Sequence, residues 1–485
     1  MQTQIHSSIS AAFLLALAPA TPVVADEPID IGSQRELFVD HHLIDRLAGA
    51  ELQLHRPQAR EVVLKFEQPW EGIYSGYETV LKDGDTFRFY YRGMPEAKHD
   101  FDTETTCVAE SKDGVHWTKP KLRIYAARGT KDNNIVLARS RGCHNLAPFI
   151  DTKPGCPPER RYKALGGTGA PGLLAFVSAD GLRWEQLQAE PVITKGAFDS
   201  QNNAFWSASE KRYVCYFRVF RDGKRWIARA TSEDFIHWTE PVDLELGGKP
   251  REHLYTNQFD PYVRAPHIYL GLPTRFLPGR RVVTKAEARA IATPTEWDYV
   301  SDCTDIVLGS ARGGKNFSRT FMEAFVRPGA DLRNWTSRAN YAARGIVQTG
   351  ERELSIYVKH QAGYPSIHIR RYTLRPDGFV SVHGPYEGGE MVTRPLTFSG
   401  STLSLNFASS AAGGLRVELQ TPDGKPIDGF ALADCLEVIG DRIEHKVRWK
   451  SGATLSKLAG KPVRLRFQLK DADLYSLQFT GSVGD

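Results

Sequence analysis

Long apolar runs are missing from this 485-residue sequence, and the longest, at residues 11–18, is too short to span a membrane. The formal net charge is only +5 and is spread along the chain, which argues against a nucleic-acid-binding protein. The six cysteines form neither a Cys-x-x-Cys pair nor a zinc-like cluster with histidine. Serine-hydrolase elbows, P-loops and His-Glu-x-x-His motifs are also absent, which removes three common catalytic classes.

The first 25 residues contain no Lys, Arg, Asp or Glu, and small residues precede Asp26. We interpret residues 1–25 as a secretory signal peptide, although its usual basic start is missing; a disordered tail is the alternative. The mature protein is then expected to be secreted or periplasmic, without a membrane span. Export permits disulfides, for which Cys143 and Cys156 are the best candidate pair, with buried free thiols as the alternative.

Glycine, proline and aromatic residues are abundant instead, with 42 Gly, 28 Pro, 24 Phe, 18 Tyr and 9 Trp. This composition favours many short strands and tight turns over long helices. A Ser-x-Asp-Gly-x-x-Trp motif occurs at residues 111–117 and 178–184, with a degenerate copy at 232–238 and a weaker one at 311–317. The Asp-Gly pair supplies a positive-φ turn position, and Trp117, Trp184 and Trp238 are expected to pack after it as structural residues.

Each motif follows a similar series of strand-like segments, so the chain contains an internal repeat. A fourth repeat unit starts near Thr256 and carries an insertion at about residues 276–302, and a fifth starts near Tyr341. Five units of three or four strands predict an all-β fold, a five-bladed β-propeller over residues 26–385. Residues 36–54 are the candidate for the strand that closes it.

The sequence pattern changes after about Tyr386. Residues 403–407, 415–419 and 463–467 alternate apolar with polar side chains, and a Pro-Asp-Gly turn signal follows the second run. This period of two predicts a small antiparallel β-sandwich at residues 390–485. Packing against the propeller is its expected role, and glycan binding is the alternative.

This architecture resembles that of glycoside hydrolase family 32, and the propeller alone resembles those of families 43, 62, 68 and 130. The segments at residues 35–40, 319–325 and 377–382 are similar to those of exported bacterial proteins related to family 32. The resemblance implies a carbohydrate-active protein. The family's Trp-x-Asn-Asp-Pro-Asn-Gly, Arg-Asp-Pro and Glu-Cys motifs are absent, so no catalytic residue is transferred from it.

Candidate catalytic residues come from aligning the five innermost strands on a closing apolar residue. These residues are Val80, Phe149, Phe205, Tyr262 and Val347. Two positions earlier the first and fourth strands carry Glu78 and Asp260, which are expected to face each other across the channel. A carboxylate pair of this kind performs glycoside hydrolysis. We assign Glu78 as acid, Asp260 as base or nucleophile and Asp199 as a third carboxylate; backbone- or Arg-bound carboxylates are the structural alternative.

The innermost strands are also rich in amides, which would be costly in a dry core and suit a wet pocket that binds sugar hydroxyls. The candidate substrate-binding residues are Tyr77, His144, Asn145, Gln201, Asn202, Asn203, Asn257, Gln258, Arg344 and Glu323. Arg344 is suited to binding a carboxylate or sulfate, whereas an ion pair with Arg319 or Arg327 is the alternative role of Glu323. Trp70, Tyr77 and Trp206 are candidates for stacking on sugar rings.

The sequence therefore predicts an exported glycoside hydrolase that cleaves an oligo- or polysaccharide, including acidic ones, by acid/base catalysis. A non-catalytic carbohydrate-binding propeller is the alternative. No cofactor or metal ligand set is predicted. The Asp/Asn content is compatible with a structural Ca²⁺, but no loop has a recognisable calcium-binding spacing.

Overall fold

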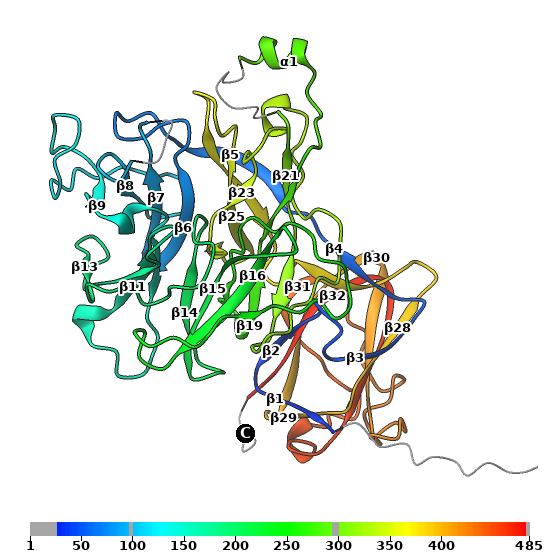
Figure 1. The fold of residues 1–485 in the computed structure, drawn as a ribbon. Coiled ribbons are helices and arrows are strands. Elements are labelled where there is room, and N and C mark those ends of the chain that lie inside the picture. Colours follow the sequence, from blue (N-terminus) through cyan, green and yellow to red (C-terminus); the bar gives the residue numbers. More distant parts are fainter. Residues whose placement is uncertain (1–26, 97–99, 293–299, 482–485) are drawn as a thin grey trace, which may run out of the picture.

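A computed structural model describes residues 27–96, 100–292 and 300–481, and the described chain is almost entirely β-structure (Figure 1). The predicted signal peptide, residues 1–25, lies outside these residues. The single α-helix within them, α1 (Lys285–Ala290), is too short to cross a membrane. It lies inside the insertion predicted in the fourth repeat and starts with a capping box between Thr284 and Glu287.

The repeated motif folds into the same turn in its first three copies. Ser111 Oγ accepts a hydrogen bond from the Gly114 amide, and Asp113 Oδ1 accepts two more from the following amides. The second copy repeats these contacts with Ser178 and Asp180. Gly114 and Gly181 have φ near +75°, which confirms the predicted positive-φ position, and Phe235 adopts the same conformation in the degenerate third copy.

Five small antiparallel sheets follow one another along the chain. The first contains β6 (Gly76–Asp83), β7 (Thr86–Gly93), β8 (Thr105–Ser111) and β9 (Ile135–Ala138). The second contains β10 (Ala147–Ile150), β11 (Tyr162–Gly166), β12 (Leu174–Ser178) and β13 (Glu185–Gln186). The third contains β14 (Asn203–Ser207), β15 (Arg212–Arg221), β16 (Lys224–Ser232) and β17 (Val242–Asp243).

The last two sheets are less regular. The fourth contains β18 (Asp260–Tyr262), β19 (Ala265–Gly271) and β22 (Gly309–Ala311), beside a hairpin of β20 (Thr274–Leu277) and β21 (Cys303–Ile306). The fifth contains β23 (Tyr341–Ala342), β24 (Val347–Gly350), β25 (Glu353–His360), β26 (His368–Leu374) and β5 (Gln58–Lys65). The strand that completes the fifth sheet is therefore β5, and the expectation that residues 36–54 would do so is wrong.

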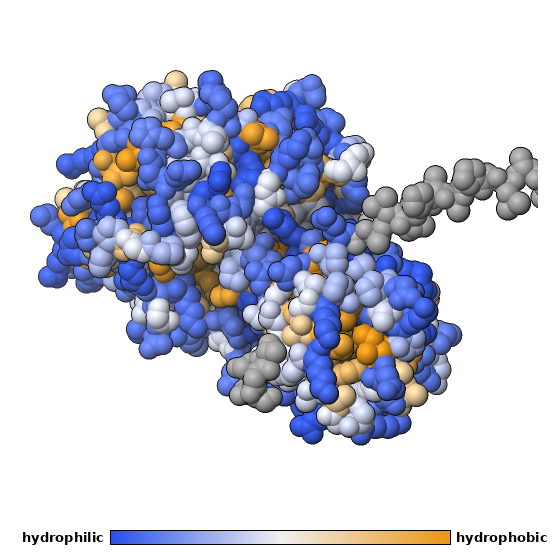
Figure 2. All heavy atoms as spheres, turned by 90° about the horizontal axis from the view of Figure 1, so that it is seen from below, coloured by the Kyte–Doolittle hydropathy of each residue, from blue (hydrophilic) through white to orange (hydrophobic). Residues whose placement is uncertain are grey.

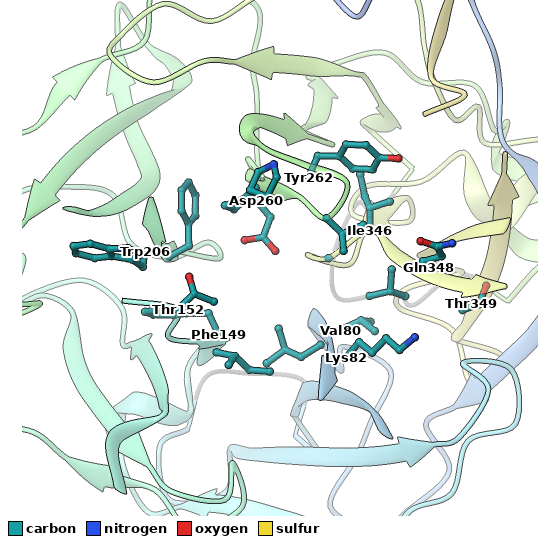
Figure 3. A pocket seen from close by; sticks show the side chains of 18 of the residues that line it. Val80, Lys82, Phe149, Thr152, Trp206, Asp260, Tyr262, Ile346, Gln348 and Thr349 are labelled. Atoms are coloured by element: carbon teal, nitrogen blue, oxygen red, sulfur yellow. The ribbon is translucent and has the colours of Figure 1, made fainter. Parts of the chain in front are cut away.

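Each of the five sheets has one strand nearest the centre, here called its first strand; these are β6, β10, β14, β18 and β24. The first strands of successive sheets lie against one another around a common centre (Figure 3). Strand β10 contacts β6 and β14, β14 contacts β18, and β24 contacts β6. The last contact includes backbone hydrogen bonds in which Arg344 donates to the Glu78 carbonyl and Val80 donates to the Arg344 carbonyl. The ring of sheets thus brings residues from the start and the end of the repeat region together.

The C-terminal part is one eight-stranded antiparallel sheet that also takes up the N-terminal strands. Its strands are β2 (Arg35–Leu37), β3 (Ile44–Ala48), β4 (Glu51–Leu54), β27 (Val380–Gly384), β28 (Gly389–Thr393), β30 (Thr402–Gln420), β31 (Asp441–Lys446) and β32 (Arg464–Thr480). A parallel pair of β1 (Ile29–Gly32) and β29 (Leu396–Phe398) lies beside it. Residues 29–54 therefore pair with the C-terminal strands because their alternating side chains complete that core.

Four 3₁₀ turns complete the described elements: η1 (Arg141–Cys143), η2 (Pro158–Arg160), η3 (Leu332–Asn334) and η4 (Leu455–Lys457). Figure 2 shows a largely hydrophilic surface on a larger and a smaller lobe. All six cysteines are free thiols, so the candidate disulfide between Cys143 and Cys156 is not formed. Cys143 is fully buried in an apolar cluster, which is the alternative that the sequence left open.

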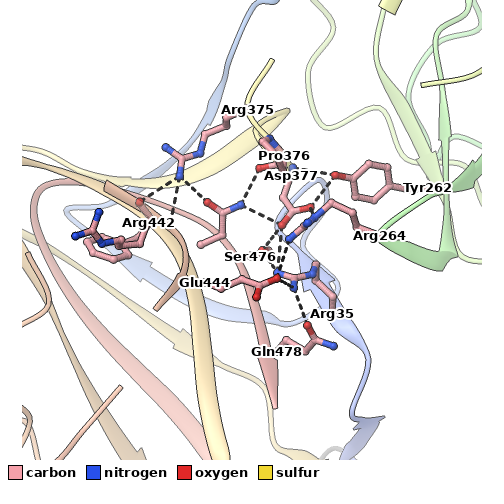
Figure 4. Close-up of polar contacts among 12 residues, drawn as sticks. Arg35, Tyr262, Arg264, Arg375, Pro376, Asp377, Arg442, Glu444, Ser476 and Gln478 are labelled. Atoms are coloured by element: carbon pink, nitrogen blue, oxygen red, sulfur yellow. Dashed lines mark hydrogen bonds and ion pairs between the residues drawn. The ribbon is translucent and has the colours of Figure 1, made fainter. Parts of the chain in front are cut away.

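A buried acid joins the ring of sheets to the C-terminal sheet (Figure 4). Asp377 is fully buried and accepts hydrogen bonds from Tyr262 and Arg264 of the fourth sheet and from Asn406 and Ser476 of the C-terminal sheet. Arg35 completes the contact with an ion pair at 3.4 Å. Burial alone would raise the pKa of Asp377, but Arg264, Arg35 and the hydrogen bonds hold it below its usual value.

The segments that carry the family resemblance gather at this junction. Residues 35–40 include Glu36, whose carboxylate contacts His267 at 2.8 Å and Arg312 at 2.7 Å. Asp377 belongs to residues 377–382, and the Val39 carbonyl accepts a hydrogen bond from Thr320 of residues 319–325. These segments therefore hold the two parts of the molecule together, and none of them lines either of the pockets at the centre of the ring.

Candidate active site

A wide pocket opens where the first strands end (Figure 3). The five closing apolar residues aligned from the sequence, Val80, Phe149, Phe205, Tyr262 and Val347, all line it. Its volume is about 820 Å³, and its walls are predominantly apolar. The sequence alignment of the inner strands is thereby confirmed at this level. The size alone would suit a ligand, since binding pockets usually measure about 300–1,000 Å³.

Asp260 is the acid that points into the wide pocket, but its charge is already matched (Figure 3). Its Oδ1 accepts a hydrogen bond from Arg344 Nη2 at 2.8 Å. Arg344 is fully buried and also donates to the carbonyls of Pro148 and Ala204. Arg344 was expected to bind a substrate anion; instead it ties three first strands together, with Asp260 as its counter-ion. This pairing is the Arg-bound structural role that the sequence left as the alternative for Asp260.

The predicted amide residues fill the centre of the ring beneath the wide pocket. Gln201 Nε2 donates to Thr79 Oγ1 and to the Glu78 carbonyl, and its Oε1 accepts from Gln258 Nε2 at 2.6 Å. Asn203 donates to Asn257 Oδ1 and Gln258 Oε1. Asn145 and Asn202 donate to the Ser200 carbonyl. All six are at most 3% exposed, so the expected wet lining is instead a buried layer whose amides bond one another and the backbone.

A second, narrow pocket of about 30 Å³ lies at the opposite end, where the first strands begin. Its lining residues are Tyr74, Tyr77, Arg92, Asp199, Tyr255, Arg338, Tyr341, Lys359 and Ala362. Three of these are cations and one is a carboxylate. Tyr77 adopts φ +56° at a bulge in β6, an unusual conformation for an aromatic residue. Such strain is a marker of functional sites, because surrounding structure must maintain it.

A histidine at this end lies between two acids. His144 is fully buried, with Nδ1 at 3.0 Å from Glu104 Oε2 and Nε2 at 3.3 Å from Asp199 Oδ1. Arg92 approaches the same ring at 3.3 Å and donates to Asn145 Oδ1. Asp199 itself is 46% exposed, and its second oxygen lies 3.7 Å from Arg218. The arrangement holds the Asp199 carboxylate in one orientation at the mouth of the narrow pocket.

Glu78 lies in β6 behind this pocket and is fully buried. Neither of its carboxylate oxygens has a hydrogen-bond partner among the described residues. Burial raises the pKa of Glu78, and the charges of Lys359 and Arg92 oppose that rise only in part. The positive groups that act on Glu78 both line the narrow pocket, whereas Asp260 lines the wide one. Glu78 therefore lies near cations of the narrow pocket, which Asp199 also lines, whereas Asp260 lies at the wide pocket with Arg344.

Lys359 is the strongest signal that sequence reasoning missed. It follows three apolar residues in β25, is 4% exposed and lies over the rings of Tyr341 and Tyr77 at 4.7 and 5.6 Å. Burial lowers its pKa to about 8, although Glu78 acts in the opposite direction. Glu104 and Arg92 were also missed. Lysine in a core strand was the only available hint, because Lys359 and Arg92 come from later strands of their sheets and Glu104 directly precedes β8, and the aligned first strands contain none of these positions.

The remaining predicted residues lie elsewhere. Glu323 is exposed and lines neither pocket, and its neighbour Arg319 pairs with Glu252 instead. Trp70 is buried in the first sheet and donates to Asn134, so it has a structural role. Trp206 lines the wide pocket. The described residues contain no group of three or more His, Cys, Asp or Glu side chains arranged to hold a metal ion.

Comparisons with known proteins give distant structural matches. No protein-family model and no curated protein matches this chain. A solved glycoside hydrolase superimposes with a TM-score of 0.45 at 11% identity, covering 67% of this chain and 93% of the other. A glycosyl hydrolase from Bacteroides ovatus gives 0.40 at 14% identity, with coverages of 69% and 97%. A structure from work on GH130 mannoside phosphorylases and β-1,2-mannoside hydrolases gives 0.39 at 15%, with coverages of 68% and 95%.

Proposed function

We propose that the five sheets are the blades of a five-bladed β-propeller, with residues 390–485 as a β-sandwich domain that is completed by the N-terminal strands. The support is the succession of small sheets whose first strands meet around one centre. We further propose that the protein is an exported glycoside hydrolase and that its active site is the narrow pocket. Export rests on the signal-peptide pattern of residues 1–25.

The observation that carries this proposal is the buried, unpartnered carboxyl of Glu78. Among the described carboxyl groups with a resolved shift, it alone has a pKa that is raised, and every other is lowered. A carboxyl group with a raised pKa holds its proton to higher pH than an ordinary carboxyl group, which suits it to protonate a leaving-group oxygen. Glu78 is therefore the general acid. A structural role would instead supply the carboxylate with hydrogen-bond donors, as Asp377 receives.

Asp199 is the second carboxylate. It is half-exposed at the mouth and is held by His144 on one oxygen and Arg218 on the other. In the reaction Glu78 gives its proton to the glycosidic oxygen while Asp199 either removes a proton from the attacking water or attacks the anomeric carbon itself. Two carboxyl groups about 5–5.5 Å apart retain the anomeric configuration, and groups about 6.5–9.5 Å apart invert it. Glu104 and His144 are positioning residues, and Tyr77, Tyr255 and Tyr341 form an aromatic wall.

The test is release of reducing sugar from plant, algal and bacterial polysaccharides by residues 26–485. Glu78→Gln and Asp199→Asn are each expected to lose about 10²–10⁴-fold in kcat, the usual size of an acid–base contribution. Glu190→Gln, an exposed acid on the second sheet, is the matched control and should retain full activity. Thermal unfolding of each variant separates lost chemistry from lost folding. Sugar binding without release by the wild type would overturn the hydrolase proposal in favour of a carbohydrate-binding propeller.

The pH profile provides a second test of Glu78. A general acid must be protonated, so kcat/KM is expected to fall as pH rises through the raised pKa of Glu78. Lys359 holds that pKa down, because its positive charge favours the carboxylate. Lys359→Met is therefore expected to move the alkaline limb to higher pH. A limb that stays in place would show that Glu78 is not the group being titrated.

A further inference from the structure

Three cations and a single carboxylate line the narrow pocket. Arg92, Arg338 and Lys359 line it, and Asp199 is the single carboxylate among its lining residues. Lys359 lies close enough to the other two for their charges to act on it. Arg92 and Lys359 both lie over the ring of Tyr77, at 5.0 and 5.6 Å. Cations grouped in a desolvated site repel one another unless an anion joins them.

Several buried polar atoms around the pocket also have no hydrogen-bond partner among the described residues. They are Arg92 Nε, Arg218 Nη1 and Tyr341 Oη. Arg218 is 5% exposed and its Nε donates to the Ala197 carbonyl, while Nη2 approaches Asp199, so Nη1 is its remaining terminal donor. No hydrogen bond or ion pair of Lys359 Nζ is found within the described ranges. Buried donors without acceptors are costly, and a ligand that supplies oxygen acceptors removes that cost.

We propose that the sugar bound at the mouth of this pocket carries an anionic group, a uronate carboxylate or a sulfate ester, that enters the pocket and is recognised by Arg92, Arg218 and Lys359. This inference rests on the proposed function and names its substrate class. A carboxylate or sulfate offers several oxygen acceptors at once, which suits guanidinium donors, and the ammonium of Lys359 supplies a point charge. At the wide pocket Asp260 already has Arg344 as its partner, and Lys82 is the single cation among the lining residues, so a comparable cluster of cations is not found there.

Binding can be tested without turnover. The probes are D-glucuronate, glucose 6-sulfate, D-glucose, inorganic sulfate and inorganic phosphate, titrated at constant ionic strength with calorimetric detection. We expect glucuronate or the sugar sulfate to bind at least ten-fold more tightly than glucose. Arg218→Gln and Lys359→Met should each weaken that binding by roughly 10- to 100-fold, the effect of losing one hydrogen bond to a charged group. Arg183→Gln, which alters an exposed arginine on the second sheet, should leave it unchanged.

Lys359→Met replaces a buried charge with an apolar chain of similar length, so it is expected to fold, and its unfolding temperature verifies this. Arg218→Lys keeps the charge and should recover part of the affinity that Arg218→Gln loses. Equal affinity for glucose and the anionic sugars, or unchanged binding in both variants, would overturn the proposal. Binding of inorganic phosphate alone would also overturn it, because the anion would then be a separate ligand and not a substituent of the sugar.

The outcome stays separable from that of the hydrolase proposal. Glu78→Gln should bind the anionic sugar about as tightly as the wild type, because glutamine is neutral like the protonated carboxyl of Glu78. Anion-dependent binding without any hydrolysis would reject the enzyme and keep the anion site. Hydrolysis of neutral polysaccharides only, with no anion preference, would keep the enzyme and reject the anion site.

Discussion

The two pockets lie at opposite ends of the first strands, yet their chemistry differs. The wide pocket measures about 820 Å³ and has apolar walls, and its acid, Asp260, is paired with Arg344. The narrow pocket measures about 30 Å³ and gathers three cations, a half-exposed acid and a strained tyrosine in front of an unpartnered carboxyl. The larger cavity and the larger group of charged side chains therefore lie at opposite ends of the first strands. The proposal of an active site at the narrow end therefore rests on the state of its polar groups and not on cavity volume.

The largest expected change in the free energy of unfolding comes from a substitution in the wall of the wide pocket. Phe205 is 3% exposed and packs edge-to-face on Tyr269 at 4.9 Å. Phe205→Ala should lower the free energy of unfolding by about 3–4 kcal/mol, through lost burial and a cavity. Because the wide pocket is assigned no chemistry, kcat of the folded variant should stay within about threefold of the wild type.

Denaturant unfolding and steady-state kinetics measure the two quantities on the same sample. Val263→Ala, at a position 55% exposed on the rim of the same pocket, is the control and should change neither. A large fall in kcat without a loss of stability would move the active site to the wide pocket and reverse the comparison.

The buried amide layer between the two ends should respond next most strongly. Gln201→Leu removes the donor to Thr79 and the Glu78 carbonyl and the acceptor of Gln258. Leaving these groups unpaired should cost about 2–3 kcal/mol of unfolding free energy. Gln186→Leu, at an exposed position of β13, should cost little. An unchanged stability together with a raised KM would restore the original expectation that these amides bind substrate.

Removing the acid at each end gives a smaller and directly comparable pair of effects. Asp260→Asn leaves the fully buried Arg344 without its counter-ion and should cost about 1–2 kcal/mol of unfolding free energy with activity retained. Asp199→Asn should cost less stability, because its carboxylate is 46% exposed, while activity is lost. Equal destabilisation with equal activity in the two variants would remove the distinction between the two ends.

The smallest expected effect is a pH dependence of stability confined to the narrow end. The pKa of Lys359 is lowered from 10.5 to about 8 in the folded protein, so between these values the unfolded chain binds more protons. The contribution of Lys359 to the free energy of unfolding should therefore rise as pH increases from about 8 to 10.5, so the wild type should gain stability relative to Lys359→Met over this range. Lys359→Met should flatten this rise, whereas Lys82→Met, at an exposed site on the wide pocket, should not. A slope that persists in Lys359→Met would assign the proton to another group.

Much of the fold could be predicted because local chemistry dictates it. The Ser-x-Asp-Gly-x-x-Trp motif specifies its turn through hydrogen bonds within seven residues, so its geometry is fixed wherever it occurs. The apolar residues that close each first strand also carry a local signal, and they do line one pocket. The closing strand of the fifth sheet was assigned wrongly, because 36–54 and 58–65 are both short strand-like segments. Only the partners available in three dimensions distinguish them.

The sequence by itself determined an all-β chain of repeated small sheets with a polar centre, since turn chemistry and strand periodicity are properties of neighbouring residues. The tertiary structure decided which polar residues are satisfied. Asp260 and Arg344 lie 84 positions apart and neutralise each other, while the Glu78 carboxyl has no hydrogen-bond partner in the part of the chain that the structure describes. Arg92 and Lys359 reach the narrow pocket from different strands, and Glu104 contacts His144 beside it. Burial and pairing depend on contacts between distant segments, so the chemical character of each acid became visible only in the folded chain.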